Sequence, residues 1–157
     1  GGLEAGGAAV TRIDLRELDL RYCTGCFNCW VKTPGECTTR DEAPRVRAAV
    51  IGSDFTLLAA PLVLGFPCAL LKKGVDKFLP LLLPYFDVVE GEAHHAKRYK
   101  RYPKLGLVVE KEAATTALDL QIVERIFRRT ALNFRTRLAV FAASDQPAGE
   151  VCRAVLQ

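Results

Sequence analysis

The sequence contains no methionine and no long uninterrupted run of apolar residues. Its most apolar segment, around 55–71, is broken by Pro61, Gly65 and Pro67, so we expect no membrane span and no membrane partner. It also lacks an N-terminal segment with the charged, apolar and small-residue order of a signal peptide. We therefore expect a cytoplasmic protein, in which reducing conditions argue against structural disulfides.

The first fifteen residues, GGLEAGGAAVTRIDL, read as the end of a helix followed by a short strand over 9–15. At 157 residues the chain is long enough for one domain with its own core. We interpret residues 1–157 as a single domain that is incomplete at its N-terminus.

The charge of the chain excludes some classes of protein. Half of the residues are hydrophobic and a quarter are charged, which is typical of a globular domain and not of a disordered chain. The net charge of +4 is too small to indicate a nucleic-acid partner, although basic residues gather in 94–104 and 125–129. We expect no nucleic-acid partner.

The apolar pattern predicts an α/β fold. Residues 54–63, 104–110 and 136–143 are apolar almost throughout, as strands buried on both faces of a parallel sheet are. Helical spacing or capping residues predict helices over 41–52, 68–79 and 117–132, and a helix start near Pro147. Pro80 and Pro84 predict irregular structure, followed by a long polar loop over 87–103. Strands that alternate with helices in this way predict a doubly wound parallel sheet in a three-layer αβα arrangement.

Four of the six cysteines lie within YCTGCFNCWVKTPGEC, residues 22–37, with the spacing C-x2-C-x2-C-x7-C. The opening C-x2-C-x2-C is typical of iron–sulfur ligation, whereas structural zinc more often uses two separated pairs. Thiols without a metal, covered by Phe27 and Trp30, are the main alternative, and zinc or a disulfide remains open. We interpret Cys68 and Cys152 as structural.

Three loops are expected at one edge of the sheet: the cysteine stretch, residues 60–67 and residues 109–113. Each follows an expected strand, and parallel α/β sheets bind ligands outside the carboxyl ends of their strands. We therefore expect the three loops to line one rim, with Glu110 and Lys111 as candidate cofactor-binding residues there.

The residues of 9–110 resemble a known family. The stretch CTGCFNCWVKTPGEC, followed by SDFTLLAAPLVLGFP and LKKGVDKFLP, is similar to the NADPH-dependent FMN reductase-like branch of the flavodoxin-like superfamily, which includes the iron–sulfur flavoproteins. The resemblance implies a flavodoxin-like fold whose first strand and phosphate-binding loop are missing from this chain. It also implies that a 4Fe-4S cluster beside FMN is held by Cys23, Cys26, Cys29 and Cys37.

In that branch, the loop after the third strand runs along the flavin ring. The resemblance therefore implies contacts to FMN from Pro61, Leu62, Val63, Leu64, Gly65 and Phe66. His94 and His95 would contact the flavin or a substrate, although adjacent histidines in a polar loop are often only solvated. Nearby Lys97, Arg98, Lys100 and Arg101 would attract the phosphates of NAD(P)H, unless they too are only solvated.

The leading hypothesis is an FMN-dependent oxidoreductase that takes electrons from NAD(P)H or a ferredoxin. Its acceptor would be a quinone, a flavin or another small molecule, and no side chain is assigned a catalytic role. The family resemblance implies a homodimer or a tetramer. The alternative is a non-catalytic electron carrier or a redox sensor based on the cysteines or their cluster.

Overall fold

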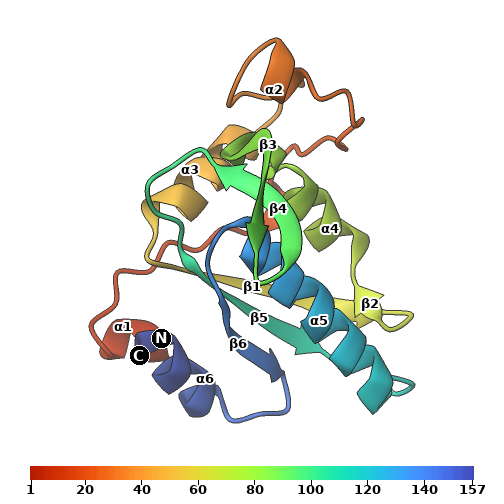
Figure 1. Cartoon of the computed structure of the whole chain (residues 1–157). Helices are drawn as coiled ribbons and strands as arrows, with labels where there is room; N and C mark the ends of the chain where they lie inside the picture. Colours follow the sequence, from red (N-terminus) through yellow and green to blue (C-terminus); the bar gives the residue numbers. More distant parts are fainter.

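The computed structural model describes all of residues 1–157, and a four-stranded sheet lies at its centre (Figure 1). The strand order is β2-β1-β5-β6, formed by β1 (Phe55–Val63), β2 (Phe66–Pro67), β5 (Lys104–Glu110) and β6 (Leu138–Ala143). The pairs β1–β5 and β5–β6 are parallel, and the short β2 pairs antiparallel with the end of β1. The three apolar segments expected as parallel strands are therefore confirmed.

The main core lies on the sheet face formed by Leu105, Leu107 and Val109 of β5. The helices that pack there are α3 (Ala43–Gly52), α4 (Ala69–Asp76) and α5 (Ala117–Asn133). α1 (Gly2–Ala5) packs against α6 (Ala148–Leu156), which lies along β6. Parallel strands flanked by helices confirm the α/β class and fit a flavodoxin-like fold.

α5 shows how local sequence defines a helix. The Thr116 hydroxyl accepts the backbone N–H of Asp119, and the Asp119 carboxylate accepts the N–H of Thr116, so the first turn is capped from both sides. The buried side of the helix is formed by Val123, Phe127 and Ala131. The apolar residues Leu118, Ile122 and Ile126 also lie in α5, but they are exposed.

The strand expected over 9–15 is wrong. Residues 8–14 have no regular structure, and a 3-10 helix, η1 (Leu15–Glu17), follows because the Asp14 carboxylate accepts the backbone N–H of Arg16. Leu15 instead packs against Gly74 of α4, where a Cβ would lie 3.0 Å from its side chain. The segment before the cysteines thus runs over a helix and not within the sheet.

The prediction of a long polar loop over 87–103 is also wrong for most of these residues. After η2 (Leu79–Leu81), the strands β3 (Leu82–Val89) and β4 (Glu92–Lys97) form an antiparallel hairpin. Its two-residue turn, Glu90–Gly91, has positive φ at both positions, which is the geometry that suits the twist of a hairpin. The register shifts between Leu82 and Phe86, around Pro84, which has no N–H to donate to the ladder.

No helix is both long and apolar enough to cross a membrane.

Candidate functional site

The carboxyl ends of β1 and β5 meet at one edge of the sheet, as expected. Pro61 and Glu110 are paired neighbours in the parallel ladder. Beyond them, the Leu64 backbone N–H donates to Oε2 of Glu112 at 2.9 Å, which ties the two loops together. Lys111 forms an ion pair with Asp145, which lies just beyond the end of β6. The structure therefore brings Pro61–Phe66, Glu110 and Lys111 to one rim.

The turn between β1 and β2 has a tight, defined shape. Leu64 and Gly65 have φ values of 52° and 76°, and Val63 pairs with Phe66 across the turn. A Cβ at Gly65 would lie 2.7 Å from a carboxylate oxygen of Asp119, so only glycine fits. Val63 and Leu64 project apolar side chains into solvent, and Leu64 is 95% exposed. The tip of this turn is an apolar surface held by hydrogen bonds at its base.

The cysteine stretch does not lie at this rim, so that expectation is wrong. Its short helix α2 (Asn28–Val31) packs against η2, and the Trp30 indole N–H donates to the backbone oxygens of Leu79 and Leu82. Gly35 faces the side chain of Arg98, just after β4. Figure 1 shows α2 at the top of the molecule, above β3 and well away from β2 and the ends of β5 and β6. The loop is anchored by the hairpin and the end of α4, not by the sheet.

The four thiols of this stretch differ in their exposure. Cys29 is buried, Cys37 is half-buried, and Cys23 and Cys26 are exposed. Burial raises the pKa of the Cys29 thiol, and the charges of Cys37, Cys23 and Cys26 raise it further. The structure contains no group of three or more His, Cys, Asp or Glu side chains whose arrangement could hold a metal ion. Ligation of a cluster by these thiols therefore stays a prediction.

A buried ion pair lies beside Cys37. Nζ of Lys77 lies 2.8 Å from Oδ2 of Asp41, and the two side chains are 2% and 0% exposed. The Asp41 carboxylate also accepts the backbone N–H groups of Arg21 and Ala43. Burial alone would raise the pKa of Asp41, but the hydrogen bonds from Lys77, Arg21 and Ala43 hold it below its usual value. Lys77 also donates toward Sγ of Cys37 at 3.9 Å, so a positive charge adjoins this thiol.

Both histidines lie in β4 and not in a loop. His94 is buried, with Nδ1 3.1 Å from the amide oxygen of Asn133 and Nε2 3.3 Å from Glu92. The His95 ring lies against the rings of Trp30 and Phe86, at centroid distances of 4.8 and 4.6 Å. The structure thus places His95 beside the cysteine stretch, away from Pro61–Phe66, and the contact with flavin stays a prediction.

Sequence reasoning missed two residues that shape this region. Lys77 was hidden within the apolar periodicity of α4 and the residues after it, where nothing distinguishes a buried lysine from an exposed one. Arg135, in the left-handed conformation with φ of 51°, pairs with Asp87 and donates to the backbone oxygen of His95. A glycine at position 135 would have signalled such a turn, but arginine does not.

Comparison with known proteins gives a partial match. No family model matches the chain. An iron-sulfur flavoprotein of Archaeoglobus fulgidus is 35% identical to it over 78 residues, which is 50% of this chain and 34% of the relative. The chain thus spans about a third of the length of that relative. Together with the parallel sheet, the match supports a relationship to flavoproteins of flavodoxin-like fold.

Proposed function

We propose that this chain is part of a flavin-dependent electron-transfer protein. In this proposal it binds FMN and a 4Fe-4S cluster, takes electrons from NAD(P)H or a ferredoxin and reduces a quinone, a flavin or another small acceptor. The observation that carries the proposal is the 35% identity to an iron-sulfur flavoprotein. The four cysteines, closely spaced in the sequence, and the apolar turn at the carboxyl edge support it.

The turn at Pro61–Phe66 suits one side of a flavin. A flat isoalloxazine ring needs an apolar wall, and Val63 and Leu64 offer exposed apolar side chains on a turn of defined geometry. The Leu64 N–H is already engaged by Glu112, so the turn contributes mainly apolar contact and shape. When bound, FMN supplies hydride and single-electron chemistry, and the chain supplies binding and orientation.

The cysteine stretch provides the type of ligand that an iron–sulfur cluster needs. Thiolates are the usual ligands of such clusters. Burial, and after it the neighbouring Cys37, Cys23 and Cys26, raise the pKa of Cys29. Exposed Cys23 and Cys26 would have to move toward Cys29, because the thiols are not yet arranged as a metal site. Nζ of Lys77 lies 3.9 Å from Sγ of Cys37, so a cation adjoins this candidate ligand.

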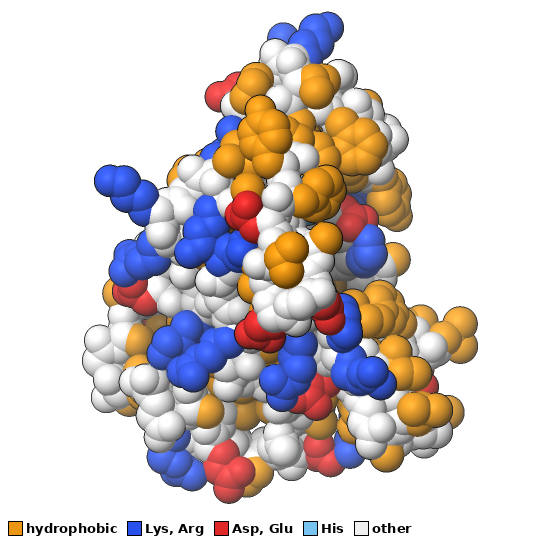
Figure 2. Space-filling model, viewed as in Figure 1, with side chains coloured by type: hydrophobic (Ala, Val, Ile, Leu, Met, Phe, Trp, Pro, Cys, Tyr) orange, Lys and Arg blue, Asp and Glu red, His pale blue; other side chains and the backbone are white.

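Exposed apolar side chains lie in the cysteine stretch and in the neighbouring hairpin. Phe27 and Val31 of the stretch, and Tyr85, Phe86 and Val88 of β3, are each at least half exposed. Figure 2 shows apolar side chains gathered in this upper part of the molecule. Such patches mark protein contacts, and the proposal includes self-association into a homodimer or a tetramer.

The direct test is to reconstitute the full chain anaerobically with iron, sulfide and FMN, and to remove unbound material. We expect about four iron atoms per chain and visible absorption that bleaches on reduction. Cys29→Ser should lose the iron, whereas Cys152→Ser, in α6, should keep it. Iron retained by Cys29→Ser, or absent from the parent chain, would contradict cluster binding, and failure to retain FMN would separately contradict the flavin.

A non-catalytic electron carrier or thiol-based redox sensor is the second candidate, favoured by the exposure of Cys23 and Cys26. Steady-state consumption of NAD(P)H separates it from the enzyme. A carrier or sensor would change redox state reversibly with negligible turnover, whereas a reductase would consume many equivalents of NAD(P)H per chain.

A further inference from the structure

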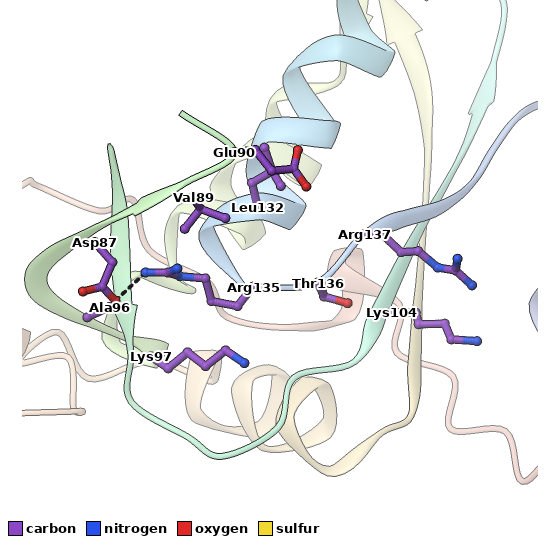
Figure 3. A pocket seen from close by; sticks show the side chains of 10 residues that line it. All are labelled: Asp87, Val89, Glu90, Ala96, Lys97, Lys104, Leu132, Arg135, Thr136 and Arg137. Carbon is purple, nitrogen blue, oxygen red and sulfur yellow. Dashed lines mark hydrogen bonds and ion pairs between the residues drawn. The ribbon is translucent and has the colours of Figure 1, made fainter. Parts of the chain in front are cut away.

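A concave surface lies between the β3–β4 hairpin and the amino ends of β5 and β6. It is an open cavity of about 840 Å³, which is within the usual range for small-molecule sites. The hairpin contributes Asp87 and Lys97 among others, and the sheet side contributes Lys104, Arg135 and Arg137 (Figure 3). Apolar contact comes from Val89, Ala96 and Leu132.

The cavity carries an excess of positive charge. Four basic and two acidic side chains line it, and Arg135 with Asp87 forms the one ion pair among them. Lys97, Lys104 and Arg137 take part in no ion pair in the structure. Figure 3 shows Lys97 on the hairpin side, and Lys104 and Arg137 on the sheet side with their charged ends directed away from it, so the unpaired cations are spread along the surface. Unpaired cations attract anions, and phosphate oxygens suit both lysine and the planar arginine fork.

This cavity is separate from the carboxyl-edge turn. Lys104 begins β5 and Glu110 ends it, so the length of the strand, about 20 Å at 3.3 Å per residue, lies between the two sites. A nicotinamide bound in the cavity could not reach a flavin at Pro61–Phe66. A ligand here therefore serves another purpose than donating hydride, and its binding does not depend on the proposed function.

Arg135 gives the cavity a link to the hairpin. Its guanidinium holds Asp87 of β3 and the backbone oxygen of His95 in β4, and its side chain is only 15% exposed. An anion in the cavity would compete with the Asp87 carboxylate for this guanidinium. Asp87 is therefore the natural competitor of any anionic ligand.

We propose that this cavity binds a small polyanion that carries phosphate groups. The volume exceeds what a single phosphate needs, and the apolar part of the lining suits an organic group attached to the phosphates. Charge supplies most of the affinity, so binding weakens as salt rises.

Isothermal titration of the full chain with pyrophosphate tests the proposal. We expect saturable binding of one anion per chain, and a loss of affinity of at least about tenfold in the triple variant K97Q/K104Q/R137Q. The matched control R12Q/K32Q/R153Q removes three exposed bases that lie outside the cavity and changes net charge equally. It should bind pyrophosphate like the parent chain.

Asp87→Asn provides a second, opposite test. It removes the carboxylate that competes for Arg135, so it should tighten pyrophosphate binding. Lys97→Gln alone, at an exposed position, should weaken binding even if the triple variant folds poorly. No saturable binding to the parent chain, an equal loss in the control variant, or weaker binding to Asp87→Asn would overturn the proposal.

Discussion

Replacing Lys77 by methionine should strongly destabilise the protein, because it leaves the buried Asp41 carboxylate without its cation. The 2.8 Å separation corresponds to an attraction of about 6 kcal/mol at an effective dielectric constant of about 20, before desolvation is subtracted. Removing one member of a buried pair typically costs about 3–5 kcal/mol. Since single domains are stable by about 5–15 kcal/mol, Lys77→Met should lose a large part of the total.

Urea unfolding of the wild type and variants measures this loss. The double variant D41N/K77M should recover most of it, because no uncompensated charge is then buried. The control is Lys72→Met in α4, the helix that ends just before Lys77. The ion pair of Lys72 with Asp76 is exposed, so this change should cost less than about 1 kcal/mol. A Lys77→Met loss as small as that of Lys72→Met would refute the reasoning.

Acid should reduce the effect of Lys77→Met. The pKa of Asp41 is lowered in the folded protein, so its interactions stabilise the wild type above the unfolded value of about 4 and are lost as pH falls through the folded value. In the variant, the carboxyl group takes up a proton more easily and ceases to be a buried charge. The difference in unfolding free energy between wild type and variant should therefore shrink below about pH 4.

Three further predictions concern the turn at the carboxyl edge and the anchor of the cysteine stretch. Gly65→Ala should cost at least about 1–2 kcal/mol of unfolding free energy, because Gly65 has a positive φ and a Cβ there would contact Asp119. Gly52→Ala is the control and should not destabilise the protein, because the space around Gly52 is open. Equal effects of the two changes would count against the turn geometry. Trp30→Phe removes the indole N–H that donates to two backbone oxygens, so it should cost about 0.5–1.5 kcal/mol of unfolding free energy. It should also speed proteolysis within residues 22–37. Unchanged cleavage would show that these hydrogen bonds do not anchor the stretch. Burial lowers the pKa of His95, so its contribution to stability is complete above about pH 6.5 and is lost as pH falls toward its pKa in the folded protein. Denaturation at pH 7.5 and 5.5 should therefore show a larger decline in unfolding free energy for the wild type than for His95→Asn.

Much of the sheet and its helices could be predicted because the signals are local. The apolar runs at 54–63, 104–110 and 136–143 correspond to β1, β5 and β6, and Thr116 with Asp119 marks the start of α5. The convergence of Pro61–Phe66 with Glu110 and Lys111 followed from the parallel direction of two adjacent strands. The β3–β4 hairpin was missed although Glu90–Gly91 is a suitable turn, because Pro84 and the mixed polarity of the strands obscured the alternation.

The sequence alone determined the kinds of groups that are present: buried strands, an apolar turn and four closely spaced thiols. Tertiary structure decided where the thiols lie, since Trp30 is held by backbone oxygens 49 and 52 residues further along the chain. It also decided that Lys77 is buried against Asp41, and that four basic residues from the hairpin and the sheet surround one cavity. Local patterns encode hydrogen bonding and burial within an element, whereas these contacts join elements whose proximity no short pattern records.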